Sequence, residues 1–347
     1  MAYVKSSIVA RTLAALALAL AIAVPPALAQ DQKVTVATPG GALHFYPFYV
    51  AEAAGLFKNE GITIDWVDVG AGSRQIAAVA SRSADFAVVG MQPSISAREN
   101  GAELVAVAAL FNAYPIQLVL TPAAMEKTGI APGMPIDDVV SKLKGVTIAV
   151  TGIGSTTDVL LRSWLVKRGK NPDQEITIQP LGNPAAMFAA LEQGAIDGVM
   201  LGAPFPERAE AAGVGKIVVD PLKGGIPELE GVPYTAIISS NGLVKEKPEL
   251  VQSVVRALTA AMKLTAAEPD KVGTMLKSYF PDTDEAIYKA FEPNYRGKSA
   301  TTPVISKADY QKLVDWIAIT SDKPITVTFE DFVDNQFAEK AAGDLLK

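Results

Sequence analysis

The residues most able to contact a ligand lie in three short loops of similar composition. Each loop follows an apolar run and carries glycine, then a hydroxyl or amide side chain where a helix is expected to start. The loops are residues 70–75, 90–94 and 151–157. Glycine lets the backbone approach a ligand, and the free N–H groups and positive dipole end of a helix favour anionic oxygens. We therefore expect an anionic or polar ligand here, although ordinary helix capping would use the same residues.

Cationic and aromatic side chains lie near these loops. Arg74 and Arg162 are the nearest basic residues, and Arg74, at a loop–helix junction, could bind a carboxylate or sulfonate through two parallel hydrogen bonds. A solvated helix position is the alternative for Arg74. His44 is the only histidine and is expected either to bind the ligand or to pack in its loop. Phe45 and Tyr46 beside it could sandwich a ring or belong to the core.

The composition argues against several other kinds of site. The absence of Cys excludes thiol nucleophiles and thiolate ligands, and a single His speaks against a histidine metal site. Residues 152–155 read GIGS, but Thr157 stands where the dinucleotide fingerprint needs Gly, and the lysine of a phosphate loop is missing. A Ser–His–Asp site would have to use His44, and no G-x-S-x-G sequence occurs. We therefore expect no catalysis, no metal and no other cofactor.

Apolar runs alternate with amphipathic runs through most of the chain, a pattern typical of α/β folds. The expected strands are 34–38, 62–69, 86–90, 104–110, 116–121, 147–152, 176–182, 198–202, 216–220 and 234–240. The expected helices are 47–57, 73–83, 93–100, 155–169, 183–195, 204–213, 247–270 and 307–320. The order predicts two α/β lobes, lobe I at 30–120 and 235–347 and lobe II at 121–234. Two crossovers, near 119–123 and 231–236, would form a hinge beside a ligand cleft.

The N-terminus has the three parts of a secretory signal peptide. Lys5 and Arg11 precede an apolar run at 12–24, and the sequence Ala-Leu-Ala follows at 27–29. The run is too short to span about 30 Å of hydrocarbon as a membrane anchor. We expect cleavage after Ala29 and release of a soluble periplasmic monomer without a lipid anchor. Cleavage makes the formal net charge of −6 more negative by two, which argues against a nucleic-acid partner.

Five segments, at 45–72, 84–110, 143–169, 190–205 and 247–270, resemble the nitrate/sulfonate/taurine-type substrate-binding proteins of ABC importers. This family also includes binding proteins for thiamine-precursor pyrimidines. The segments include FYPFYVAEAAGLF, LKGVTIAVTGIGSTTD and ALEQGAIDGVMLGAPF. The resemblance covers almost the whole chain after the leader and implies the type II periplasmic binding fold. It also implies two partners, a small-molecule ligand and an ABC importer permease in the inner membrane. The pyrimidine-synthesising relatives need His and Cys clusters that this chain lacks.

The resemblance also implies which positions line the cleft. In lobe I they are Leu43, His44, Phe45, Tyr46, Ser73 and Gln92, and in lobe II they are Ser155, Thr156, Thr157, Asn183 and Phe205. Arg74 and Asn112 complete the expected ligand contacts. Capping needs only one of the tandem hydroxyls at 155–157, so we expect Ser155 and Thr156 to donate hydrogen bonds to the ligand.

The expected function is binding of a small organic anion for import. The helix starts favour a sulfonate or carboxylate, and the aromatic first loop leaves a ring-bearing ligand open. Two other functions stay open at this point. A receptor that presents its ligand to a membrane sensor would have the same fold and site, and an exported hydrolase or transferase is a further alternative.

Overall fold

A computed structural model describes residues 32–281, 298 and 300–344. The expected leader and its cleavage after Ala29 lie outside these residues. Within the described part, no helix has the length and apolar character needed to cross a membrane.

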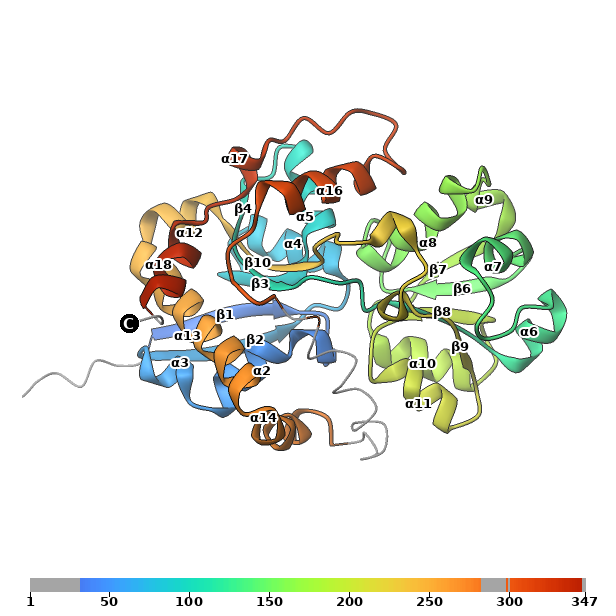
Figure 1. Cartoon of the computed structure of the whole chain (residues 1–347), viewed down its shortest axis with the longest axis horizontal. Coiled ribbons are helices and arrows are strands. Elements are labelled where there is room, and N and C mark those ends of the chain that lie inside the picture. Colours follow the sequence, from blue (N-terminus) through green and yellow to red (C-terminus); the bar gives the residue numbers. More distant parts are fainter. Residues whose placement is uncertain (1–31, 282–297, 299, 345–347) are drawn as a thin grey trace, which may run out of the picture. The chain divides into compact units, whose positions relative to one another are not determined.

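The first of two five-stranded sheets has the strand order β2-β1-β3-β10-β4 (Figure 1). Its strands are β1 (Gln32–Thr38), β2 (Ile62–Asp68), β3 (Phe86–Gly90), β4 (Leu104–Phe111) and β10 (Thr235–Ser240). β1 and β3 are parallel, and β10 runs antiparallel between β3 and β4. Every residue of β3, β4 and β10 is buried. β3 and β4 have the near-continuous apolar sequences of strands covered on both faces, whereas β10 also buries Thr235, Ser239 and Ser240. The expected return of the chain to this sheet at 234–240 is confirmed.

The second sheet has the order β7-β6-β8-β5-β9. Its strands are β5 (Gln117–Leu120), β6 (Thr147–Val150), β7 (Thr177–Pro180), β8 (Gly198–Leu201) and β9 (Lys216–Val219). β6 is parallel to β7 and β8, whereas β5 is antiparallel to β8 and β9.

The place of β5 corrects one expectation. We expected the strand at 116–121 in lobe I, but it pairs in the second sheet, so the chain leaves the first sheet after Phe111. The chain therefore crosses to the second sheet before residue 117, earlier than the expected crossover at 119–123. The apolar pattern of this segment predicts a strand, but it does not say which sheet supplies the partners.

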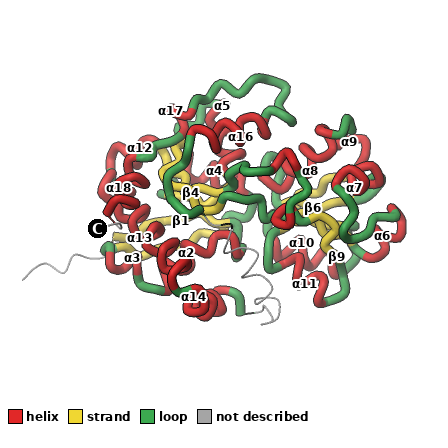
Figure 2. The backbone as a smooth tube through the Cα atoms, viewed as in Figure 1, coloured by secondary structure: helices red, strands yellow, loops and turns green. Residues whose placement is uncertain are grey.

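Helices follow the strands of both sheets (Figure 2). Those outside the second-sheet region are η1 (Leu43–Phe45), α2 (Tyr46–Ala53), α3 (Leu56–Asn59), α4 (Gly72–Ala80), α5 (Met91–Glu99), α12 (Asn241–Glu246), α13 (Pro248–Ala267), α14 (Pro269–Leu276), η4 (Lys277–Tyr279), α16 (Lys307–Ile317), α17 (Phe329–Phe332) and α18 (Gln336–Asp344). Those between β5 and β10 are α6 (Pro122–Thr128), α7 (Ile136–Lys142), α8 (Thr156–Lys167), α9 (Pro172–Glu175), α10 (Pro184–Glu192), α11 (Phe205–Ala211), η2 (Pro221–Lys223) and η3 (Pro227–Leu229).

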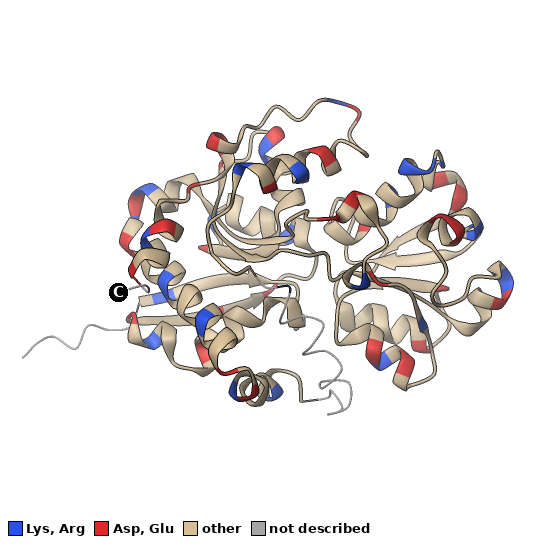
Figure 3. Ribbon diagram, in the orientation of Figure 1, with Lys and Arg blue, Asp and Glu red and all other residues tan. Residues whose placement is uncertain are grey.

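Burial follows the expected amphipathic faces. Tyr310, Leu313, Trp316 and Ile317, predicted to share one face of a C-terminal helix, are all buried on α16. The single helix expected at 47–57 is divided into α2 and α3 at Gly55, which has a positive φ of 70°. Charged residues lie mainly on the helices and loops rather than on the strands (Figure 3).

Candidate functional site

Two cavities lie where strand ends of the two sheets meet. The smaller, which we call the inner cavity, has a volume of about 60 Å³ and is lined by η1, the starts of α4 and α8, and the ends of β3 and β8. The larger, which we call the outer cavity, has a volume of about 800 Å³ and is lined by residues 68–74, 151–153 and 180–183. Thr151 lines both cavities, so they are adjacent. The three loops singled out in the sequence therefore meet in one region.

A hydroxyl network holds the loop before α8. The Ser155 hydroxyl donates to the Gly152 carbonyl at 2.6 Å, and Thr151 Oγ1 donates to Ser155 Oγ at 3.0 Å. Thr157 Oγ1 accepts from the Thr151 N–H at 3.0 Å and lies 2.9 Å from both Thr151 Oγ1 and Ser155 Oγ. These contacts use the hydroxyl hydrogens of Thr151, Ser155 and Thr157 inside the loop.

Thr156 differs from these neighbours. Its side chain is buried and lines the inner cavity, and none of the hydrogen bonds between described residues involves its hydroxyl. Ser155 occupies the N-cap position of α8, but its side chain does not cap the helix. The N–H groups of the first turn are therefore available to ligand oxygens. Of the two donors expected at this helix start, this geometry favours Thr156 and not Ser155.

Glycine allows the two sheets to approach each other at this helix. A Cβ atom added at Gly90, at the end of β3, would collide with Thr156 Oγ1. One added at Gly152 would lie 2.7 Å from the Ala71 Cβ atom. The Leu43 N–H donates to the Ala203 carbonyl at 3.1 Å, which adds a backbone hydrogen bond between the same two regions.

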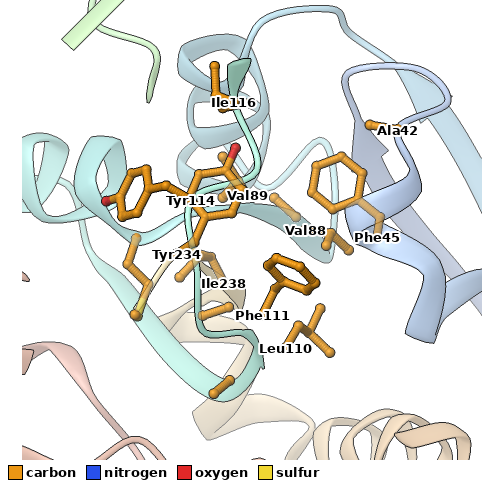
Figure 4. Close-up of a cluster of buried hydrophobic side chains, with 14 of the residues drawn as sticks. Ala42, Phe45, Val88, Val89, Leu110, Phe111, Tyr114, Ile116, Tyr234 and Ile238 are labelled. Carbon is orange, nitrogen blue, oxygen red and sulfur yellow. The ribbon is translucent and has the colours of Figure 1, made fainter. Parts of the chain in front are cut away.

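His44 is neutral in this site. Burial lowers its pKa to about 3, and its Nδ1 atom is buried without a hydrogen-bond partner among the described residues. The imidazole contacts the Phe45 ring at a centroid distance of 4.1 Å and the Tyr234 ring at 5.3 Å. Nδ1 also lies 3.2 Å from the position that a Cβ on Gly202 would take. Figure 4 shows Phe45 and Tyr234 within a cluster of buried hydrophobic side chains.

The inner cavity contains neutral polar groups and aromatic rings. None of the described residues that line it is Asp, Glu, Lys or Arg. A ligand oxygen there would meet the Thr156 hydroxyl, helix N–H groups and a neutral imidazole. Across the described residues, no group of three acidic, His or Cys side chains could hold a metal ion.

The outer cavity carries charge. Arg74 and Asp68 line it, both are exposed, and neither forms an ion pair with a described residue. Asp68 Oδ1 accepts from the Gly70 N–H at 2.9 Å. Asn183 caps α10 by accepting from the Ala186 N–H at 2.9 Å, which leaves its amide nitrogen free to donate.

The structure brings most of the expected residues to the two cavities. The inner cavity is lined by His44, Phe45, Ser155, Thr156, Thr157 and Phe205, and the outer cavity by Ser73, Arg74 and Asn183. Ser73 lies in the first turn of α4, whose N-cap is Ala71 rather than the expected Ser73.

The other expected residues do not line either cavity. Leu43 is fully buried in the core, and Tyr46 is buried at the start of α2. Gln92 is buried on α5 and donates to Ser96 Oγ at 3.1 Å. Asn112 is exposed after β4. Each follows a strand end, but its side chain belongs to the core, to a neighbouring helix residue or to solvent.

Sequence reasoning missed several lining residues. Gln75 lies one turn into α4 and reaches the inner cavity, and Tyr234 reaches it from just before β10. Asp68 reaches the outer cavity from the end of β2. The helical repeat from Gly72 could have suggested Gln75. The place of Tyr234 depends on β10 returning between two distant strands, which local sequence does not show.

Comparison with known proteins places this chain in a family. The model of the NMT1-like family matches residues 29–276. The taurine-binding periplasmic protein of Escherichia coli (strain K12) is 29% identical over 250 residues, which cover 70% of this chain and 69% of that protein.

Two solved structures share the fold. A protein from Bordetella bronchiseptica RB50 superposes with a TM-score of 0.80 at 23% identity, covering 92% of this chain and 99% of that chain. The alkanesulfonate-binding protein SsuA from Xanthomonas axonopodis pv. citri bound to MOPS superposes with a TM-score of 0.69 at 19% identity, covering 87% and 98%. The resemblance and the fold expected from the sequence are thus confirmed. Because the family match spans more than half of the sequence, the chain belongs to the NMT1-like family and has the fold of the periplasmic binding proteins.

Proposed function

We propose that this chain is the periplasmic solute-binding component of an ABC importer and binds a small organic anion. The observation that carries the proposal is the inner cavity, which combines the uncapped start of α8 and the Thr156 hydroxyl with aromatic walls. The taurine-binding and alkanesulfonate-binding relatives support a sulfonate-like or carboxylate-like head group.

The chemistry of the inner cavity suits an anion held by neutral donors. A helix start favours a negative charge by about 0.3–1 kcal/mol when exposed and by more when partly buried. Hydrogen bonds to a charged acceptor are roughly twice as strong as those between neutral groups. Phe45, Tyr234 and Phe205 line the same cavity and would contact the ligand's carbon atoms next to the head group.

The proposed partner is the permease of the importer, and the proposed action is closure rather than catalysis. The backbone hydrogen bond from Leu43 to Ala203 and the close approach of Gly90 to Thr156 are the contacts that closure would form. Each lobe would move as a unit. Lobe I comprises residues 30–120 and 235–347 and lobe II comprises residues 121–234, except that Gln117–Leu120 is now assigned to lobe II. Presentation of the ligand to a membrane sensor would use the same closure.

A ligand screen tests this function. At about 100 times its dissociation constant, a ligand stabilises the folded protein by about 2.7 kcal/mol, which shifts the melting temperature by several degrees. We expect such shifts from sulfonates or carboxylates and not from neutral pyrimidines or neutral sugars. Small-angle scattering should show a smaller radius of gyration with the best ligand. Stabilisation by neutral compounds alone, or an unchanged scattering profile, contradicts the proposal.

The proposed location gives a second test. We expect cleavage after Ala29, because Ala-Leu-Ala precedes a polar segment. Intact-mass analysis of the protein from a periplasmic fraction should give a chain that starts at Gln30. A membrane fraction that retains the chain from Met1 contradicts this location, and the outcome does not depend on the ligand.

A further inference from the structure

The outer cavity holds two opposite charges that the proposed function does not use. Arg74, on the first turn of α4, and Asp68, at the end of β2, line the same cavity. No ion pair joins them, and neither pairs with another described residue. Paired surface charges compensate each other, whereas these two remain available to a third group.

The two cavities differ in what they can recognise. The inner cavity offers neutral donors and no charged side chain among its described lining, so it suits one compact head group. The outer cavity offers a guanidinium with five N–H donors and a carboxylate whose Oδ1 accepts the Gly70 N–H, while no described residue donates to its Oδ2. Asn183 adds a free amide donor there. One end of a ligand that carried both an acid and an amine would satisfy both charges.

A nitrate-sized ligand would leave the outer cavity unused. The outer cavity, at about 800 Å³, is far larger than the inner one at about 60 Å³, and Thr151 belongs to both walls. A ligand with a short chain could therefore place its head in one cavity and its other end in the other. An ammonium group in the inner cavity would have no counter-charge, which fixes the orientation.

We propose that the ligand has two ends, an anionic head in the inner cavity and an amino-acid end in the outer cavity. In this arrangement Arg74 binds the carboxylate of the amino-acid end and Asp68 binds its ammonium group. This inference rests on the proposed function, since it assigns the head group to the start of α8.

Matched ligands test each contact separately. We would titrate the protein by calorimetry with three- and four-carbon sulfonates in three forms: unsubstituted, with a terminal carboxylate, and with a terminal amino-carboxylate. A parallel series has a carboxylate head. Arg74→Gln should weaken the two acid-bearing forms about 3- to 10-fold and leave the unsubstituted form unchanged. Asp68→Asn should weaken only the amino-bearing form, by a similar factor.

Lys245→Gln is the control, because it removes one positive charge from an exposed position on α12, which lines neither cavity. If Arg74→Gln weakens all forms equally, or no more than Lys245→Gln does, the two-ended ligand is wrong while the proposed function stands. If no member of either series binds the unmodified protein, the proposed function fails as well.

Discussion

Replacing Thr156 with Val is expected to weaken binding of an anionic ligand between about 2-fold and about 150-fold. The lost hydrogen bond is worth about 0.5–1.5 kcal/mol, and up to about 3 kcal/mol when its acceptor is charged. The stability of the unliganded protein should hardly change, because the Thr156 hydroxyl makes no hydrogen bond with a described residue. Val keeps the branched shape that packs against Gly90.

Thr157→Val is the matched control for this prediction. Thr157 Oγ1 accepts the Thr151 N–H and contacts two neighbouring hydroxyls, so its removal leaves a partly buried donor without a partner. The free energy of unfolding should fall by about 1–3 kcal/mol. The two variants carry the same chemical change at neighbouring positions.

Calorimetric titration and denaturant unfolding of both variants separate ligand binding from loop structure. The expected result is a loss of affinity at unchanged stability for Thr156→Val and a loss of stability for Thr157→Val. Equal affinity with lower stability for Thr156→Val would make Thr156 structural and remove it from the ligand site.

Local sequence was sufficient to predict the loops but not the direction of each side chain within them. Glycine followed by hydroxyls at 151–157 predicted a helix start, because glycine permits the tight turn before a helix and Ser or Thr is favoured at the N-cap. The pattern did not show that Ser155 bonds back to Gly152, since that depends on how residues 152–154 turn. Thr156 and Thr157 have the same side chain, and only the fold distinguishes the Thr156 hydroxyl, which lines the inner cavity, from the Thr157 hydroxyl, which is hydrogen-bonded within the loop.

Prediction of the fold from the sequence was limited for a similar reason. Apolar runs predicted most strands within a few residues, because strand burial depends on short-range pattern. The pairing of Gln117–Leu120 with β8 and β9 depends on segments about 80 to 100 residues later in the chain. Tyr234 reaches the inner cavity for the same reason, through the insertion of β10 between β3 and β4.

Acidification is expected to destabilise the state in which His44 is buried. Burial lowers the folded-state pKa of His44 to about 3, whereas an unfolded histidine titrates near 6.5. Between these values the unfolded chain binds a proton that the folded chain does not, so stability falls as pH falls. At pH 4.5, about two units below the unfolded-state pKa, the cost relative to pH 7.5 is about 3 kcal/mol, at about 1.36 kcal/mol per pKa unit.

A second buried group opposes this effect in the unmodified protein. Burial raises the pKa of Glu207 to about 7, with a smaller contribution from Asp220. Its folded form therefore binds a proton that the unfolded chain has released above about pH 4.5, so Glu207 favours folding as pH falls. The two contributions partly cancel in a single pH profile. The contribution of His44 has to be taken from a difference between two proteins that both contain Glu207.

His44→Gln provides that difference, because glutamine is polar and does not titrate. The free energy of unfolding of each protein would be measured from pH 7.5 to pH 4.5, with and without a saturating ligand. The difference in unfolding free energy between the two proteins should change by about 3 kcal/mol in favour of His44→Gln at pH 4.5. In the proposed closure, the full difference appears with ligand bound, because His44 Nδ1 lies close to Gly202 of the second-sheet region. If the unliganded protein opens and hydrates the imidazole, His44 can be protonated at low pH and must lose that proton when ligand binds. The same free energy then appears as a loss of ligand affinity on acidification. If the pH profiles of the unmodified protein and His44→Gln are parallel both with and without ligand, the site does not hold His44 neutral. Its assignment to the inner cavity would then be wrong.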